Sequence, residues 1–177
     1  MKFKTQSIEG VVLIVADVHQ DERGGFHRSF CEEAFSKSAI EFKVKQGNIS
    51  RNRRKHTLRG FHYQAFPTQE AKVLSCIEGA IYNVVLDLRE DSSTRHKWEA
   101  VELDSGAGQS LHVPPGCANA FITLQPNTVV HYYMSEFFRE ETYRGIRFDD
   151  PYFKVVWPAK PAMISSRDAS FPDFLPG

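Results

Sequence analysis

Short runs of β-type residues recur along nearly the whole chain, and this pattern limits its fold more than any other feature. The runs are rich in Val, Ile, Tyr and Phe and are separated by turn-forming residues; they span residues 10–18, 71–90, 97–104, 109–115, 120–138 and 152–158. Only residues 29–39 carry a helix signal, with Ser29 as the expected N-cap. Many strands with one or two short helices predict an all-β chain that forms a sandwich or a closed barrel.

The sequence also predicts the connections between these runs. Glu78 and Gly79 lie between two apolar runs, which indicates a hairpin, and residues 103–110 and 125–128 are further expected turns. The Pro-rich residues 158–177 are expected to form an ordered arm around the barrel rather than a regular element. With 177 residues and no internal repeat, the chain is expected to be a single domain, residues 1–177.

Composition narrows the class of protein. Lys plus Arg and Asp plus Glu both number 22, which argues against bulk binding of nucleic acid but leaves room for a local basic pocket. The cysteines, Cys31, Cys76 and Cys117, are scattered without a CxxC pair, which is typical of reduced thiols. Residues 1–9 lack the apolar run of a signal peptide, and no segment is long enough to span a membrane. We therefore expect a cytoplasmic protein without membrane contact.

The segment TLRGFHYQ, residues 57–64, places an imidazole close to a guanidinium in a predicted strand. Strand alternation puts Arg59 and His62 on opposite faces unless Gly60 introduces a bulge, which would bring Arg59 nearer to His62. On its own this motif fits a surface arginine and a hydrogen-bonded core histidine. Taken singly, Lys72 also fits a solvated lysine, and Arg167 with Asp168 fits a solvated charge pair.

A metal site is not expected. Small barrels that bind metals through imidazoles commonly carry a His-x-His pair and a later His, but here the corresponding residues are His62, Gln64 and Asn119. One imidazole and two amides are a poor ligand set for a transition metal. The chain also lacks the P-loop, GxGxxG, GxSxG and HExxH motifs.

Several segments together resemble the dTDP-4-dehydrorhamnose 3,5-epimerase family. The matching stretches occur in the family's order over residues 21–30, 46–50, 58–64, 70–89, 113–124, 145–158 and 165–168. The resemblance implies a cupin-type jelly-roll barrel with one or two short helices, a homodimer, no metal and no cofactor. It also implies a nucleotide-diphosphate sugar as substrate, namely a nucleotide-linked 4-keto-6-deoxyhexose.

By this resemblance, His62 is the general base, Asp168 pairs with it, Lys72 stabilises an enolate, and Tyr132 returns a proton from the opposite face. The implied substrate contacts are Arg59 and Arg167 on the diphosphate or nucleotide, Gln46 and Asn48 near the nucleoside, and Arg23 and Phe26 in the partner subunit's site. Chemistry agrees with these roles, because a ketone at C4 acidifies the hydrogens on C3 and C5. Imidazole suits a base that works near neutral pH.

Three positions depart from the family's usual residues. Asn119 stands where the family has His, Asn83 where it has Asp, and Arg28 where it has Glu. If positions 83 and 119 pair, a neutral pair has replaced an ionisable one. If Arg28 faces the base of the nucleotide, a donor has replaced an acceptor, which favours cytosine over thymine and makes CDP worth testing beside dTDP.

These departures leave alternatives open. The protein could invert C3 and C5 or one centre only, on a dTDP- or a CDP-sugar, in a surface-polysaccharide or an antibiotic pathway. A 4-ketohexose isomerase, a catalytically silent sugar-nucleotide-binding cupin and a metal-dependent cupin are the other readings. Joint retention of His62, Lys72, Tyr132 and Asp168 favours an epimerase, because a binding protein needs no base and acid in one pocket.

Overall fold

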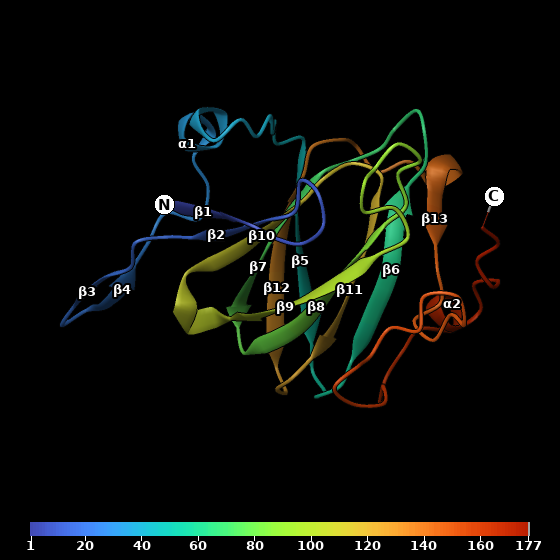
Figure 1. Cartoon of the computed structure of the whole chain (residues 1–177). Helices are drawn as coiled ribbons and strands as arrows, with labels where there is room; N and C mark the ends of the chain where they lie inside the picture. The colour runs from blue at the N-terminus through green and yellow to red at the C-terminus, as the bar shows by residue number, and fades with distance from the viewer. Residues whose placement is uncertain (177) are drawn as a thin grey trace.

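Two antiparallel sheets pack face to face in the computed structural model, which describes residues 1–176 (Figure 1). The larger sheet has the strand order β1-β2-β10-β7-β12-β5, and the smaller has the order β13-β6-β11-β8-β9. The larger sheet comprises β1 (Lys2–Thr5), β2 (Val12–Val15), β10 (Gln109–Val113), β7 (Lys72–Glu78), β12 (Thr128–Met134) and β5 (Gln46–Asn52). The smaller comprises β13 (Tyr143–Gly145), β6 (Leu58–Gln64), β11 (Cys117–Thr123), β8 (Ala80–Asp87) and β9 (Trp98–Asp104).

The chain crosses between the two sheets at almost every connection from β5 to β12. Strands β5, β7, β10 and β12 lie in the larger sheet, while β6, β8, β9 and β11 lie in the smaller one. Such alternation is the double-sheet jelly roll. The prediction of an all-β, cupin-like jelly roll is therefore confirmed.

Side-chain alternation divides the apolar residues among three clusters. Inward-facing residues of both sheets, such as Leu74, Val85 and Leu111, form the central core between the sheets. The outer face of the larger sheet is covered in part by residues around α1 (Glu32–Lys37), where Phe35 is fully buried. The outer face of the smaller sheet is covered by the C-terminal arm, through residues such as Trp157.

Two smaller elements complete the described chain. Strands β3 (His19–Asp21) and β4 (Gly24–Phe26) form a two-stranded ribbon that projects away from the barrel (Figure 1). The arm contains the one-turn helix α2 (Ser166–Ala169), whose first turn is capped by the Ser165 hydroxyl, which accepts the backbone N–H of Asp168 at 3.0 Å. Two 3-10 turns, η1 (Ser105–Ala107) and η2 (Glu140–Thr142), precede β10 and β13. No helix within residues 1–176 is long and apolar enough to cross a membrane.

Three local predictions are wrong. The segment around Glu78 and Gly79 is not a hairpin, because β7 and β8 lie in different sheets and Gly79, with φ of +77°, takes the chain from one to the other. Residues 152–158 form turns and loop rather than a strand, since their apolar side chains pack down on the smaller sheet. The helix begins only at Glu32, with Cys31 rather than Ser29 as N-cap, because Phe30 packs against Phe35 from outside the helix.

Candidate active site

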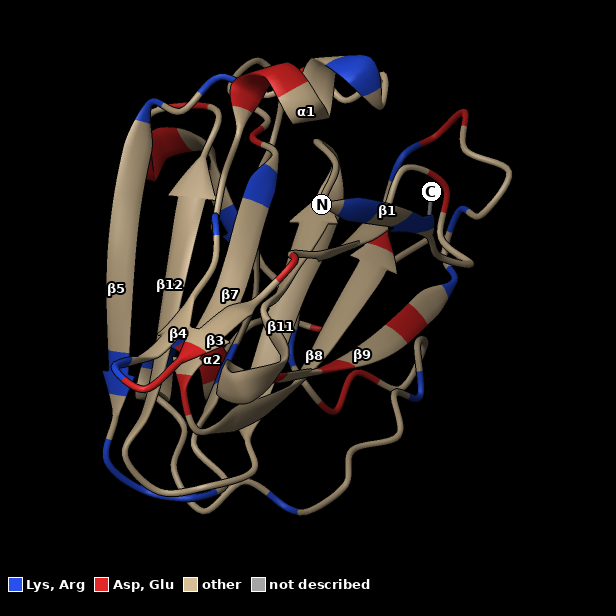
Figure 2. Cartoon of the chain, turned by 90° about the vertical axis from the view of Figure 1, so that its left-hand side faces the viewer, with Lys and Arg blue, Asp and Glu red and all other residues tan. Residues whose placement is uncertain are grey.

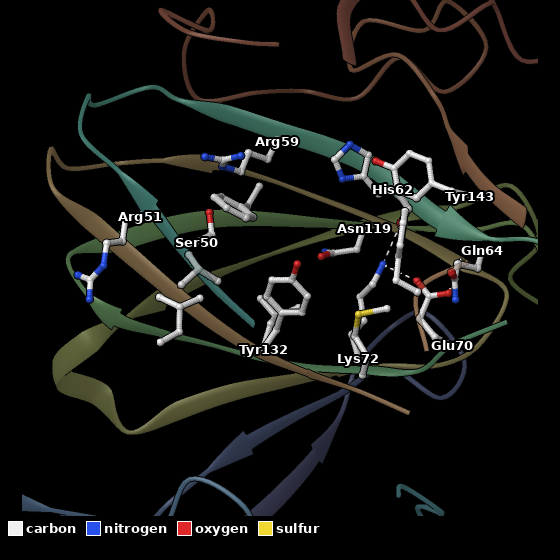
Figure 3. Close-up of a pocket in the computed structure, with 16 residues that line it drawn as sticks. Ser50, Arg51, Arg59, His62, Gln64, Glu70, Lys72, Asn119, Tyr132 and Tyr143 are labelled. Atoms are coloured by element: carbon white, nitrogen blue, oxygen red, sulfur yellow. Dashed lines mark hydrogen bonds and ion pairs between the residues drawn. The ribbon is translucent and has the colours of Figure 1, made fainter. Parts of the chain in front are cut away.

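A pocket of about 430 Å³ lies inside the barrel and is lined by residues from both sheets. Strands β5, β7 and β12 supply one wall, and β6, β11 and β13 supply the other. Figure 3 shows polar side chains from both walls, among them Asn119 and Tyr132, pointing into the same space. Within residues 1–176, no group of three or more His, Cys, Asp or Glu side chains is arranged to hold a metal ion.

His62 and Asp168 form a hydrogen-bonded pair at this pocket. His62 comes from β6, Asp168 from α2 in the arm, and His62 Nε2 lies 2.9 Å from Asp168 Oδ1. Burial opposes the charge of Asp168, but its hydrogen bonds from His62 and from the Gly60 backbone N–H outweigh burial and lower its pKa. The ionised carboxylate holds the imidazole proton on Nε2, which leaves Nδ1 free to accept a proton.

A bulge at Gly60 brings Arg59 and His62 to the same side of β6. His62 pairs with Asn119 across the sheet, whereas Arg59 pairs with Phe121 after a shift of register. Both Arg59 and His62 line the pocket, while Phe61 between them packs outward. The bulge named in the sequence analysis is therefore confirmed. Gly60 has φ of +109°, and a Cβ there would lie 2.5 Å from the Asn119 carbonyl oxygen.

Lys72 and Glu70 form an ion pair at the inner end of the pocket. Lys72 Nζ lies 2.8 Å from Glu70 Oε1, and it also donates to the backbone oxygen of His62 at 3.1 Å. Glu70 is 5% exposed and accepts the Gln64 backbone N–H. Glu70 was not predicted as a site residue. The one feature of the sequence that pointed to it is its position two residues before Lys72, which places both side chains on the same side of the chain where β7 begins.

Tyr132 approaches the pocket from the wall opposite His62 (Figure 3). The side chain of the next residue, Tyr133, packs instead on the outer face of the larger sheet. Burial raises the pKa of Tyr132, with Arg59 partly opposing this effect. The phenol therefore keeps its proton at neutral pH and can act as a donor.

Tyr143 is a second pocket residue that was not predicted from the sequence. Its ring centroid lies 5.3 Å from that of His62, and the Arg167 guanidinium lies 4.2 Å from the ring on which it stacks. Burial and the nearby carboxylate of Asp168 raise the pKa of Tyr143. Arg167 is exposed and touches the pocket only through this ring. A lone tyrosine at the start of a short strand gave no pattern that could have identified it.

The opposite end of the pocket is basic. Arg51 and Arg59 both line it, and Arg59 Nε donates to Asn52 Oδ1 at 2.8 Å. Lys and Arg also continue along residues 53–55, directly after β5, and the ribbon is coloured blue around that end of the strand in Figure 2. The pocket thus has a cationic mouth and an inner end that carries the titratable groups.

Comparison with known proteins agrees with this geometry. The family model described as dTDP-4-dehydrorhamnose 3,5-epimerase matches residues 5–175. The chain belongs to this family. A dTDP-4-dehydrorhamnose 3,5-epimerase from Sinorhizobium fredii is 35% identical over 173 residues, which are 97% of this chain and 89% of the relative.

Solved structures of the epimerase family superpose closely. A dTDP-4-dehydrorhamnose 3,5-epimerase from Bacillus anthracis, crystallised with TDP and PPi, gives a TM-score of 0.94 at 29% identity, covering 98% of this chain and 99% of that one. A 3'-monoepimerase from Streptomyces bikiniensis, in complex with dTDP-quinovose, gives a TM-score of 0.89 at 30% identity, covering 95% and 85%. The family thus includes proteins named for two inverted centres and proteins named for one.

The amides that depart from the family's usual residues form a pair in the structure. Asn119 Nδ2 donates to Asn83 Oδ1 at 2.7 Å and to the Val84 backbone oxygen at 3.2 Å. Asn83 is fully buried, and its Nδ2 is the buried side-chain polar atom that lacks a hydrogen-bond partner within the described residues. Leaving such a group unpaired costs about 1–3 kcal/mol. Positions 83 and 119 therefore do pair, as a neutral unit.

The remaining expected contacts lie outside this pocket. Arg23, Phe26 and Arg28 are exposed on or beside the projecting ribbon, where Arg23 pairs with Asp21 and Phe26 is 72% exposed. None of the three lines the pocket of its own chain. Gln46 and Asn48 lie on β5 next to the lining residues, and Asn48 Nδ2 contacts the sulfur of Met134, which does line the pocket.

Proposed function

We propose that the protein inverts C3, C5 or both in a nucleotide-linked 4-keto-6-deoxyhexose through an enolate. The observation that carries this proposal is the placement of the His62–Asp168 pair and the Tyr132 phenol on opposite walls of one pocket, with the Lys72 ammonium at its inner end. Inversion needs a base on one face of a carbon and an acid on the other. A site that only binds a sugar needs neither.

In the first step, His62 Nδ1 takes the proton from the carbon next to the C4 ketone. The C–H electron pair becomes the new C–C double bond, and the carbonyl pair moves onto O4. The carboxylate of Asp168 stabilises the imidazolium that forms. The Lys72 ammonium supplies positive charge for the enolate oxygen, a contact worth about 3 kcal/mol in comparable sites.

In the second step, Tyr132 donates its proton to the same carbon from the opposite face. The double-bond electrons form the new C–H bond, O4 returns to a ketone, and the phenol becomes a phenolate. The imidazolium then loses its proton to solvent and the phenolate regains one, so that no proton is gained or lost over the cycle. This chemistry requires neither a metal nor a redox cofactor.

The cationic mouth of the pocket is proposed to bind the diphosphate. Arg51 and Arg59 both line that end, and the planar guanidinium can hold two phosphate oxygens at once. The names of the relatives and the TDP bound in the Bacillus anthracis structure favour dTDP. Calorimetry with dTDP and with CDP tests this choice, and tight dTDP binding without CDP binding ends the CDP hypothesis based on Arg28.

We also propose that two copies of the chain assemble and exchange their ribbons. The ribbon β3–β4 projects from the barrel with Phe26 72% exposed, and Ile77 of β7 is 53% exposed. A second copy would cover these side chains and bring Arg23 and Phe26 to the neighbouring pocket. Sedimentation should give twice the monomer mass, and a monomer at micromolar concentration contradicts the assembly.

The test of function is exchange of carbon-bound hydrogen with solvent. The protein is incubated in heavy water with dTDP- and CDP-linked 4-keto-6-deoxyglucose, and deuterium at C3 and C5 is followed by NMR. Exchange at both centres, at one or at neither separates a 3,5-epimerase from a monoepimerase and from a silent binding protein. His62→Ala should abolish exchange, whereas His96→Ala, which removes an imidazole in edge-to-face contact with Tyr152 outside the pocket, should retain it.

A further inference from the structure

The orientation of the Asn119 amide is fixed by a backbone carbonyl. The Val84 oxygen can only accept a hydrogen bond, so the Asn119 atom 3.2 Å away must be the nitrogen. The same nitrogen lies 2.7 Å from Asn83, and the Asn83 atom that faces it must therefore be the oxygen. The direction of the whole chain of hydrogen bonds follows from the single acceptor at Val84.

Both hydrogens of the Asn119 amide are consumed by these two bonds. Asn119 lines the pocket, and its Oδ1 accepts no hydrogen bond from any described residue. The group that it presents to a ligand is consequently a carbonyl oxygen, which accepts and cannot donate. Asn119 also stands directly opposite His62 in the β6–β11 pairing, so this acceptor lies on the wall that carries the base (Figure 3).

Asn83 has no contact with the pocket, yet it sets this orientation. It is fully buried on the inner face of β8, two residues from Ile81 and from Val85, which both belong to the central core. An apolar side chain would suit that position better, because Asn83 Nδ2 has no hydrogen-bond partner within residues 1–176. The amide is kept in the core at a cost, and its oxygen makes a single hydrogen bond, to Asn119.

We propose that Asn119 is a specificity-determining residue, whose oxygen accepts a hydrogen bond from a ring hydroxyl of the hexose, and that Asn83 is the positioning residue that turns this oxygen toward the pocket. The proposal rests on the proposed function, since it assumes that a keto-sugar occupies the site. Next to the C4 ketone, the sugar offers hydroxyls at C3 and C2. A substrate without the matching hydroxyl leaves the acceptor unpaired and is discriminated against.

The test is a cycle that couples a side chain with a substrate hydroxyl. Values of kcat/KM are measured for wild type and Asn119→Ala on the 4-keto-6-deoxyglucose nucleotide and on its 2-deoxy and 3-deoxy analogues. For the hydroxyl that contacts Asn119, removing either the Asn119 amide or the hydroxyl should lower kcat/KM about tenfold. Removing both should lower kcat/KM no further. Losses that multiply for both analogues overturn the role of Asn119.

The role of Asn83 is tested by rescue. Asn83→Ala should abolish the coupling between residue 119 and the hydroxyl, whereas Asn83→Asp, which still accepts from Asn119 Nδ2, should preserve it. Thr123→Val serves as the matched control, because Thr123 is fully buried on the same strand as Asn119 and hydrogen-bonds outside the pocket. The control should lower the melting temperature and leave the coupling intact.

The outcomes separate the two proposals. Full coupling in Asn83→Ala overturns the positioning role. If the wild type catalyses exchange but the losses in kcat/KM from Asn119→Ala and from removal of the hydroxyl multiply, the specificity proposal alone is overturned. The epimerase assignment then still stands. Absence of exchange by the wild type on every substrate overturns the proposed function, and with it the inference that depends on it.

Discussion

Replacing Asp168 with Asn should reverse the tautomer of His62, and the structure shows why the change is so specific. One oxygen of the carboxylate, Oδ2, accepts the Gly60 backbone N–H at 3.2 Å, and the other, Oδ1, faces His62 Nε2 at 2.9 Å. An amide at this position must keep its oxygen on the Gly60 side, because a backbone N–H can only donate. Its NH₂ group would then face the imidazole and force the proton onto Nδ1.

A proton on Nδ1 occupies the lone pair that must accept the proton from the substrate carbon. The wrong tautomer costs about 10⁴-fold in a Ser-His-Asp triad, and we expect a loss of about 10³- to 10⁴-fold in the exchange rate here. At 1.36 kcal/mol for each factor of ten, that loss corresponds to about 4–5 kcal/mol of barrier. The assay is solvent deuterium incorporation at C3 and C5 under substrate saturation.

The matched control is Asp87→Asn. Asp87 is fully buried and holds Arg89, Ser92 and Thr94 at a place outside the pocket. This variant should unfold more easily but should keep the wild-type exchange rate per folded molecule. An Asp168→Asn protein that retains more than a tenth of the wild-type rate refutes the dyad as the base.

Three further predictions concern the ion pair at the inner end of the pocket, the bulge at Gly60 and the stability of the fold at acid pH. Glu70→Gln should lower kcat about tenfold with little change in KM, because the Lys72 ammonium loses its anchor; an unchanged kcat would show that Glu70 is not needed to place it. Gly60→Ala should cost roughly 2–5 kcal/mol in urea unfolding, since its φ is +109° and its Cβ would meet backbone, while Gly106→Ala should stay within about 0.5 kcal/mol; equal effects refute the steric argument. Burial opposes the charge of Asp87, but hydrogen bonds from its neighbours lower its pKa below the usual 3.8. Its contribution to stability should thus be complete well above pH 3.8 and lost as pH falls through the folded-state pKa, so Asp87→Asn should show a flatter acid limb in urea titrations; parallel limbs exclude this source.

The sequence carried most of the fold because strand alternation and turn residues are local signals. It failed where strand pairing, which is not local, decided the outcome. Glu78 and Gly79 have the composition of a hairpin turn, yet β7 pairs with β10 and β12 while β8 pairs with β9 and β11. The residues of a short turn do not determine which strand the segment that follows the turn will pair with.

The site shows the same division between local and distant information. The bulge beside His62 could be predicted from Gly60, because both lie within one strand. The contact between His62 and Asp168 spans 106 residues and was expected only from the family resemblance. Tyr143 and Glu70 escaped notice because their roles depend on neighbours that the barrel brings together. Tyr143 has no spacing pattern in the sequence that could reveal its position, and Glu70 has only its two-residue spacing to Lys72.

Three of the buried polar groups of this barrel show two different uses of burial. Asp87 accepts several hydrogen bonds and ties a loop to the sheet, which is a structural use of a buried charge. The Glu70–Lys72 pair and the Asn83–Asn119 pair are different, because a buried ion pair is weak evidence for stability and Asn83 Nδ2 has no hydrogen-bond partner within residues 1–176. Both pairs instead fix the orientation of one pocket-facing group, an ammonium in the first case and a carbonyl oxygen in the second. Under the proposed mechanism, both pairs hold a donor and an acceptor in place before substrate arrives, which is the preorganisation that an enolate mechanism requires.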